Sequence, residues 1–144
     1  MKTMSRKDTY HDTVKKALVK DGWHVTHDPL SIIYEGTTVS TDLGAEKATG
    51  FQGQRIAIEI IAVEVKDFDS RSLISEFEKA LGQYRLYRAL LKRNDPDRVI
   101  FLAIRETVYN TFFQLPAIQV VTADDDVRLI VFDEQKEEIV LWIK

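Results

Sequence analysis

Residues 55–104 pass from an apolar strand pattern through a long amphipathic helix pattern into a second apolar strand pattern. From 73 to 91, apolar side chains recur every three or four positions, as on one face of an α-helix, and Asn94-Asp95-Pro96 stops the pattern. Residues 55–66 give the strongest strand signal, and residues 99–104 are continuously apolar, as in a strand buried on both faces. Such elements have to be packed against one another, because each has an apolar side to bury.

The rest of the chain supplies further helices and strands around this centre. Residues 8–20, 105–113 and 116–122 predict helices. Residues 23–26, 32–34, 37–43, 127–132 and 137–143 predict strands, of which the last two form a closing hairpin. The expected fold class is therefore α/β, a mixed central β-sheet flanked by helices. No linker divides the 144 residues, so one domain over residues 1–144 is expected.

Several classes of protein are excluded or disfavoured by composition. The chain has no cysteine, which excludes disulfide scaffolds, thiolate metal sites and cysteine nucleophiles. No apolar run approaches the ~20 residues of a membrane span, and residues 1–8 lack the apolar stretch of a secretory signal, so a cytoplasmic location without membrane contact is expected. The net charge of −3 argues against a strongly basic nucleic-acid surface. His11, His24 and His27 show no metal-ligand spacing with one another, so surface or packing roles are expected.

The residues that could carry chemistry lie at the end of the strongest predicted strand. Glu64 and Lys66 are two positions apart, so their side chains project from the same face. Asp42 ends an earlier predicted strand and reaches the same place if the two strands are neighbours. Asp42 and Glu64 would then hold Mg²⁺, which binds through a few carboxylates and keeps several waters, while Lys66 would orient a nucleophile or offset developing charge.

This pattern has low specificity by itself, because an acid and a lysine two apart on a strand more often form a surface ion pair. Glu59 and Glu46 stay open as alternative acids, since residues 56–60 and 61–65 are near-repeats whose strand register can slip. Of these three acids, only Glu64 has a lysine two positions later, which favours the Glu64–Lys66 pair. Gln83 lies on a polar flank of the long helix, where it faces either this pair or water.

Blocks of residues along almost the whole chain resemble the XisH family, the fdxN-element excision controlling factors of cyanobacteria. The blocks are Tyr10-His11, Gly22-Trp23, Asp28-Pro29-Leu30, Asp42-Leu43-Gly44-Ala45-Glu46-Lys47, Ile61-Ala62-Val63-Glu64-Val65-Lys66-Asp67-Phe68, Ser75-Glu76-Phe77, Ala80-Leu81-Gly82-Gln83-Tyr84, Tyr109-Asn110-Thr111-Phe112-Phe113-Gln114-Leu115-Pro116 and Leu129-Ile130-Val131-Phe132.

The resemblance implies a role in programmed excision of a DNA element during heterocyst differentiation, beside a site-specific recombinase and a second small factor, XisI. It also implies a restriction-endonuclease-like PD-(D/E)XK fold. By position, Asp42, Glu64 and Lys66 match the residues that bind Mg²⁺ or Mn²⁺ and hydrolyse phosphodiesters there, and Gln83 matches a helix glutamine of some members. The segment from Gly53 to Lys66 is longer than the family's usual Gly-Gln-Lys-Ile-Ala-Val-Glu-Ile-Lys, and an insertion that displaced the strand would disturb this geometry.

Two functions are therefore expected. The first is a factor of element excision with a metal-dependent DNA endonuclease site at Asp42, Glu64, Lys66 and Gln83. The alternative is a non-catalytic accessory of a site-specific recombinase that binds DNA or a partner protein on the same fold, because a fold does not fix its chemistry. A homodimer is compatible with either, since two DNA strands invite twofold symmetry.

Overall fold

The computed structural model of the protein describes residues 6–144, so most of the segment expected to lack a secretory signal lies outside the described residues. The helices are α1 (Arg6–Lys20), α2 (Leu73–Asn94), α3 (Glu106–Thr111) and α4 (Pro116–Asp124), with a 3₁₀ turn at Phe112–Gln114. The strands are β1 (His24–His27), β2 (Leu30–Tyr34), β3 (Thr37–Thr41), β4 (Leu43–Gln52), β5 (Arg55–Val65), β6 (Arg98–Arg105), β7 (Leu129–Asp133) and β8 (Glu138–Ile143).

Six strands form a central mixed sheet in the order β1-β4-β5-β6-β7-β8. The β5–β6 and β6–β7 pairs are parallel, whereas β1–β4, β4–β5 and β7–β8 are antiparallel. The parallel pairs follow from long crossovers, since α2 joins β5 to β6 and α3 with α4 joins β6 to β7. The predicted α/β class with a mixed sheet and a closing hairpin is confirmed.

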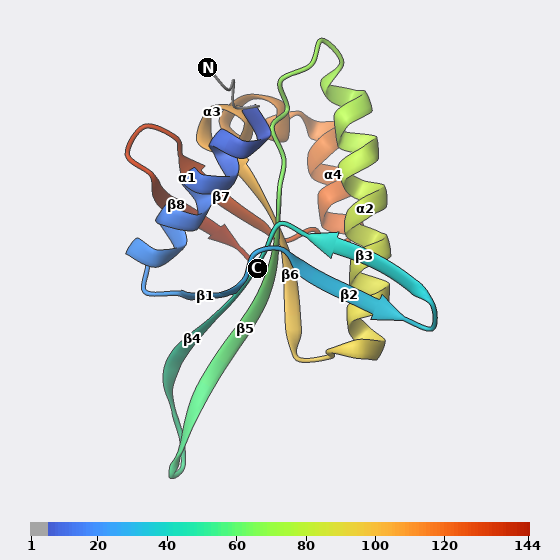
Figure 1. The fold of residues 1–144 in the computed structure, drawn as a ribbon. Coiled ribbons are helices and arrows are strands. Elements are labelled where there is room, and N and C mark those ends of the chain that lie inside the picture. The colour runs from blue at the N-terminus through green and yellow to red at the C-terminus, as the bar shows by residue number, and fades with distance from the viewer. Residues whose placement is uncertain (1–5) are drawn as a thin grey trace, which may run out of the picture.

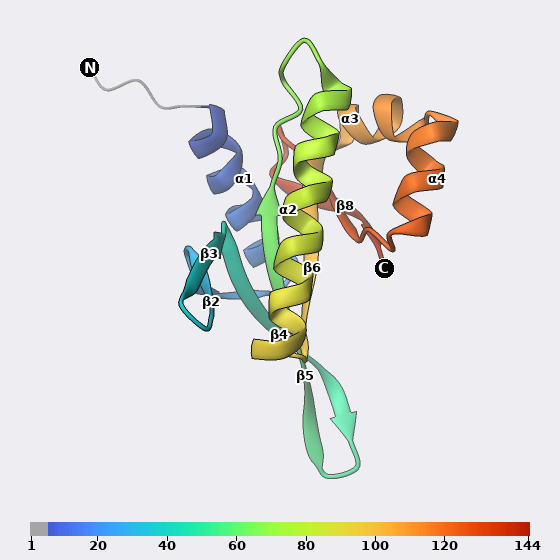
Figure 2. The same ribbon diagram turned by 90° about the vertical axis from the view of Figure 1, so that its right-hand side faces the viewer.

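Helices cover the two faces of the sheet unequally. One face packs on α1, and the other lies towards α2, α4 and a separate two-stranded hairpin, β2–β3 (Figures 1 and 2). Alternation along β5 divides its side chains between these layers: Ala62 belongs to the cluster that includes α2 residues, and Ile61 and Val63 to the cluster that includes α1 residues. Within residues 6–144, no helix is both long enough and apolar enough to cross a membrane.

The main error of the sequence prediction concerns residues 37–52. The predicted strand 37–43 ends at Thr41, and β4, for which no strand was predicted, begins at Leu43. Glycine and alanine give residues 44–50 a weak intrinsic preference for strand. These residues are nevertheless extended because they pair with β5, from Leu43 opposite Val63 to Phe51 opposite Ile56. Partner pairing has therefore overridden local propensity.

The distal half of the β4–β5 hairpin, from the Lys47–Glu59 pair to its turn, projects from the body as an arm (Figures 1 and 2). Phe51 is paired with Ile56, and Ile58 follows two positions later, so the three side chains share one face. All three are exposed in the monomer, Phe51 to 76%. The arm therefore presents an apolar face that contributes little to the core.

Two phenylalanines of the same sheet provide a matched test of this division. Phe101, on β6, is 1% exposed, whereas Phe51 is on the arm. Phe101→Ala is expected to lower the free energy of unfolding by about 3–5 kcal/mol, because it leaves a cavity. Phe51→Ala is expected to change it by no more than about 0.5 kcal/mol. Urea unfolding followed by circular dichroism measures both, and a comparable loss in the two variants would contradict the described packing.

Candidate functional site

Glu64 and Lys66 lie at the end of β5, on the face of the sheet that α2 covers. No irregularity interrupts the pairing of residues 60–65 of β5 with β6, so Glu64 shares a face with Ala62. The ladder extends one residue beyond the strand, because the Lys66 amide donates to the carbonyl of Ala103 at 3.0 Å. Lys66 Nζ lies 3.5 Å from Glu64 Oε2. Glu64 and Lys66 therefore lie on one face of the sheet and contact each other, as the sequence predicted.

Asp42 reaches this pair from the break between β3 and β4. The sequence predicted that Asp42 ends a strand that neighbours β5. In the structure Asp42 instead immediately precedes that neighbouring strand, because β4 starts at Leu43, opposite Val63. The Asp42 amide donates to Glu64 Oε1 at 3.3 Å, and the Val65 amide donates to Asp42 Oδ2 at 2.8 Å. The two carboxylates are thus joined by reciprocal contacts between adjacent backbones.

Gln83 joins the group from α2. This helix begins after Ser72, whose hydroxyl caps it by accepting from the Ser75 amide, and its apolar side is buried on the sheet. Lys66 Nζ donates a hydrogen bond to Gln83 Oε1. The side-chain oxygen of Gln83 therefore restrains the ammonium group, which also lies near Glu64. The structure brings together all four residues that the sequence singled out.

The two carboxylates are almost shielded from solvent, with Asp42 9% and Glu64 6% exposed. Their charge is felt by Tyr87 on α2, because the pKa of its phenol is raised first by burial and then by the charges of Glu64 and Asp42. Buried carboxylates are costly unless cations or hydrogen-bond donors offset their charge. Two such carboxylates, which approach each other from adjacent backbones, can offer oxygens to a cation.

The donor set fits a hard divalent cation such as Mg²⁺ or Mn²⁺, which takes carboxylate oxygens and completes its shell with water. Among the side chains that the structure describes, in residues 10–51 and 53–144, there is no group of three or more histidine, aspartate and glutamate side chains arranged to hold a metal ion. A cation at this place would therefore rest on Asp42 and Glu64.

The alternative acids lie elsewhere. Glu59 is five positions before Glu64 on a regular strand and so points to the opposite face of the sheet, where its carboxylate contacts Lys144 Nζ at 3.2 Å. Glu46 is paired with Ile60 on β5 and with His24 on β1. The structure therefore favours Glu64 over its near-repeat counterpart.

His11 is the neighbour of the site that the sequence analysis missed. Its ring lies between two carboxylates, with Nε2 2.6 Å from Asp28 Oδ1 and Nδ1 3.4 Å from Asp42 Oδ1. The prediction of a surface or packing role for this histidine overlooked one signal in the sequence: His11 precedes Val14 and Leu18 at helical spacing. The structure places its side chain half-buried. A polar ring on the apolar side of a helix needs polar partners.

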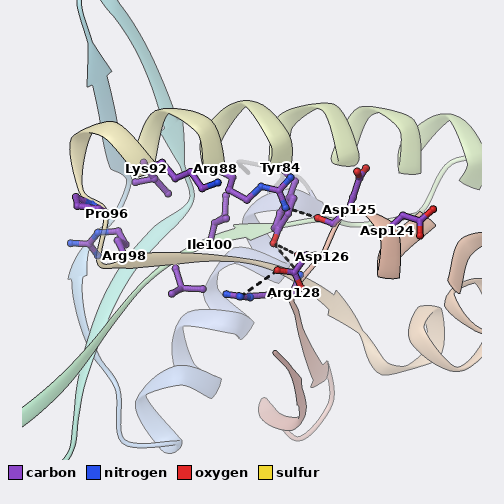
Figure 3. Close-up of a pocket in the computed structure, with 12 residues that line it drawn as sticks. Tyr84, Arg88, Lys92, Pro96, Arg98, Ile100, Asp124, Asp125, Asp126 and Arg128 are labelled. Carbon is purple, nitrogen blue, oxygen red and sulfur yellow. Dashed lines mark hydrogen bonds and ion pairs between the residues drawn. The ribbon is translucent and has the colours of Figure 1, made fainter. Parts of the chain in front are cut away.

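A basic pocket lies apart from these residues, between α2, the start of β6 and the loop that follows α4 (Figure 3). Arg88 lies over the ring of Tyr84 and donates to the carbonyl of Asp125. The Tyr84 hydroxyl donates to the carbonyl of Asp126 at 2.9 Å, and Arg128 pairs with the Asp126 carboxylate at 3.4 Å. The side chains of Arg88 and Arg128 are thus bound by residues 125–126 of the loop after α4. These contacts connect α2 to the segment between α4 and β7.

Fold and site together define an α/β protein in which a mixed sheet carries two buried carboxylates, a lysine and a helix glutamine. A family model described as "XisH protein" matches residues 4–140. The chain belongs to the XisH family. No match was found among curated proteins.

Two crystal structures are similar to the chain over nearly its whole length. An XisH family protein from Nostoc punctiforme PCC 73102 is 43% identical, with a TM-score of 0.84 over 95% of this chain and 100% of that chain. An fdxN element excision controlling factor protein from Anabaena variabilis is also 43% identical, with a TM-score of 0.84 over 95% of this chain and 99% of that chain.

Asp28, the second carboxylate beside His11, gives a pH-dependent prediction. Burial raises the pKa of Asp28, but hydrogen bonds from Lys15 and His11 and the charges of both outweigh it, so the pKa lies below its ordinary value of 3.8. A carboxylate with a lowered pKa stabilises the folded state above that ordinary value, and the contribution is lost as the pH falls towards the folded pKa. Asp28→Asn is therefore expected to lower Tm at pH 7, by up to about 4 °C, and the deficit shrinks below pH ~4.

Thermal unfolding between pH 3 and 7 measures the difference, with Asp97→Asn as the control. Asp97 is exposed and lies between α2 and β6. A deficit of the same size at pH 3 and pH 7 would show that Asp28 acts through packing and not through its charge.

Proposed function

We propose that this chain is an excision controlling factor with a nuclease-like site that hydrolyses phosphodiesters in DNA with Mg²⁺ or Mn²⁺. The observation that carries the proposal is the convergence of Asp42, Glu64, Lys66 and Gln83 from the β3–β4 break, β5 and α2. Family membership and the similarity to the fdxN element excision controlling factor protein of Anabaena variabilis support the excision role.

The proposed architecture is the restriction-endonuclease-like PD-(D/E)XK fold. Its support here is a mixed sheet in which an acid and a lysine two residues apart end one strand and a second acid precedes the adjacent antiparallel strand. Heterocyst differentiation is the proposed setting of the excision. A site-specific recombinase and an XisI-like factor are the proposed partners, with DNA as the substrate.

The roles of the side chains follow from their positions. A bound Mg²⁺ or Mn²⁺ would polarise a phosphate and lower the pKa of a coordinated water. Asp42 and Glu64 would supply carboxylate oxygens to it from two adjacent strands. Lys66, held between Glu64 and Gln83, would place its positive charge against the charge that develops on the phosphate oxygens.

A second candidate function is that of a non-catalytic accessory of the recombinase, which binds a partner protein. The observation that favours it is the arm, whose exposed apolar face of Phe51, Ile56 and Ile58 is typical of a surface that other proteins cover. On this alternative, the buried carboxylates and Lys66 stabilise the fold and catalyse no reaction.

The test is incubation of supercoiled and branched DNA with the purified protein in Mg²⁺, Mn²⁺ or EDTA. Metal-dependent nicking is expected, and Glu64→Gln and Lys66→Ala are each expected to slow it by about 10²–10³-fold. The first variant weakens a ligand of the cation, and the second removes the positive charge that would face the reacting phosphate. Glu59→Gln is the matched control, since this glutamate lies on the same strand in a near-identical sequence but faces away from the site. It is expected to cut like the unmodified protein.

Nicking that survives EDTA, or that Glu59→Gln abolishes as strongly as Glu64→Gln, would assign the activity to another site or to a contaminant. An absence of cleavage on every substrate, with an XisI-like factor added, would favour the accessory function.

A further inference from the structure

The β2–β3 hairpin leaves and rejoins the six-stranded sheet at two neighbouring points. The chain leaves the sheet through Asp28, which lies between β1 and β2, and it returns to the sheet through Asp42, which lies between β3 and β4. The pairs on either side are His27 with Gly44 and Leu30 with Thr41, so the two aspartates occupy the same level of the structure. Both crossings therefore carry a carboxylate.

His11 of α1 lies between these carboxylates and is in contact with both. Its Nε2 is 2.6 Å from Asp28 Oδ1, and its Nδ1 is 3.4 Å from Asp42 Oδ1. The second oxygen of each aspartate is also engaged: Lys15 Nζ donates to Asp28 Oδ2 at 2.8 Å, and the Val65 amide donates to Asp42 Oδ2 at 2.8 Å. Contacts thus run from α1 through Asp28 and His11 to one of the two carboxylates of the site.

An aspartate carboxylate turns readily about its last side-chain torsion, which has broad preferences. The Val65 amide restrains one oxygen of Asp42, and a group on the far side is needed to fix the other. His11 is placed there, and an imidazole can present a nitrogen to each of two carboxylates at once. Outer partners of this kind change the affinity of a site for metal by about 10–100-fold when they are removed.

We infer that His11 is a positioning residue that orients the Asp42 carboxylate for cation binding and so makes the site depend on α1. The inference rests on the proposed cation site at Asp42 and Glu64. It assigns a role to a helix that contributes no ligand itself, and it makes the docking of α1 a condition for binding the cation.

Two isosteric substitutions separate the two contacts of the ring. In His11→Asn the side-chain amide lies near the position of Nδ1 and can still donate to Asp42. In His11→Gln it lies near the position of Nε2 and can reach only Asp28. The probe is Mn²⁺ alone, titrated calorimetrically into the full chain. His11→Gln is expected to raise the Kd for Mn²⁺ by about 10–100-fold, whereas His11→Asn is expected to stay within about threefold.

His24→Gln is the control, because His24 is exposed on β1, and its Kd is expected to be unchanged. Asp28→Asn is the second variant, since it removes the negative charge of the group that Nε2 of His11 contacts and leaves Asp42 unchanged, and it is expected to raise the Kd by about three- to tenfold. The Tm of each metal-free variant is measured beside its Kd. A purely structural role would raise the Kd in His11→Asn and His11→Gln alike, in step with a fall in Tm, and would overturn the inference.

The remaining outcomes separate this inference from the proposed function. If the unmodified protein binds Mn²⁺, Asp42→Asn abolishes binding and His11→Gln binds as tightly as the unmodified protein, His11 does not position the site, while the cation site stands. If the unmodified protein binds Mn²⁺ no better than Asp42→Asn does, the cation site itself falls and this inference falls with it.

Discussion

Glu64 is a buried carboxylate near the end of an inner strand of the sheet, so its negative charge has to be offset by hydrogen-bond donors or cations. Its strand is flanked by β4 and β6, and α2 covers the face on which it lies. The compensating groups include the Asp42 amide at the β3–β4 break, the Lys66 ammonium two residues on, and through Lys66 the side chain of Gln83. Because each group comes from a different part of the chain, the electrostatics of one side chain ties β4, β5 and α2 into one arrangement.

The order of elements and the faces of β5 could be predicted because they depend on local periodicity. Alternation along a strand is a property of the backbone, so the shared face of Glu64 and Lys66 and the opposite face of Glu59 follow from the sequence alone. The apolar stripe of α2 likewise places Gln83 on a polar flank of the helix, but it does not show whether this flank faces the pair or water. Four of the residues at the site were therefore found without knowledge of the fold, although the resemblance to a family was needed to prefer a site over a surface ion pair.

What could not be predicted depends on contacts between distant segments. Strand β4 is extended because β5 offers it a partner, and its glycines and alanines carry no signal for that. His11 lies 31 positions before Asp42 and meets it only because α1 packs near the crossing points of the β2–β3 hairpin. No spacing rule covers such a meeting. A sequence shows that a polar ring on an apolar helix face needs a partner, but not which one.

The projecting arm changes how the site tolerates variation in the length of the chain. Asp42 and Glu64 lie at the base of the hairpin, and the two strands of the arm pair with each other except at the irregularity between Ala48 and Gly50. One residue added to each strand at the far end lengthens the arm by about 3.4 Å and leaves every pairing at the base as it was. Paired insertions at the tip of the arm therefore leave the positions of the two carboxylates unchanged, so the length of the arm can vary while the geometry at its base is kept.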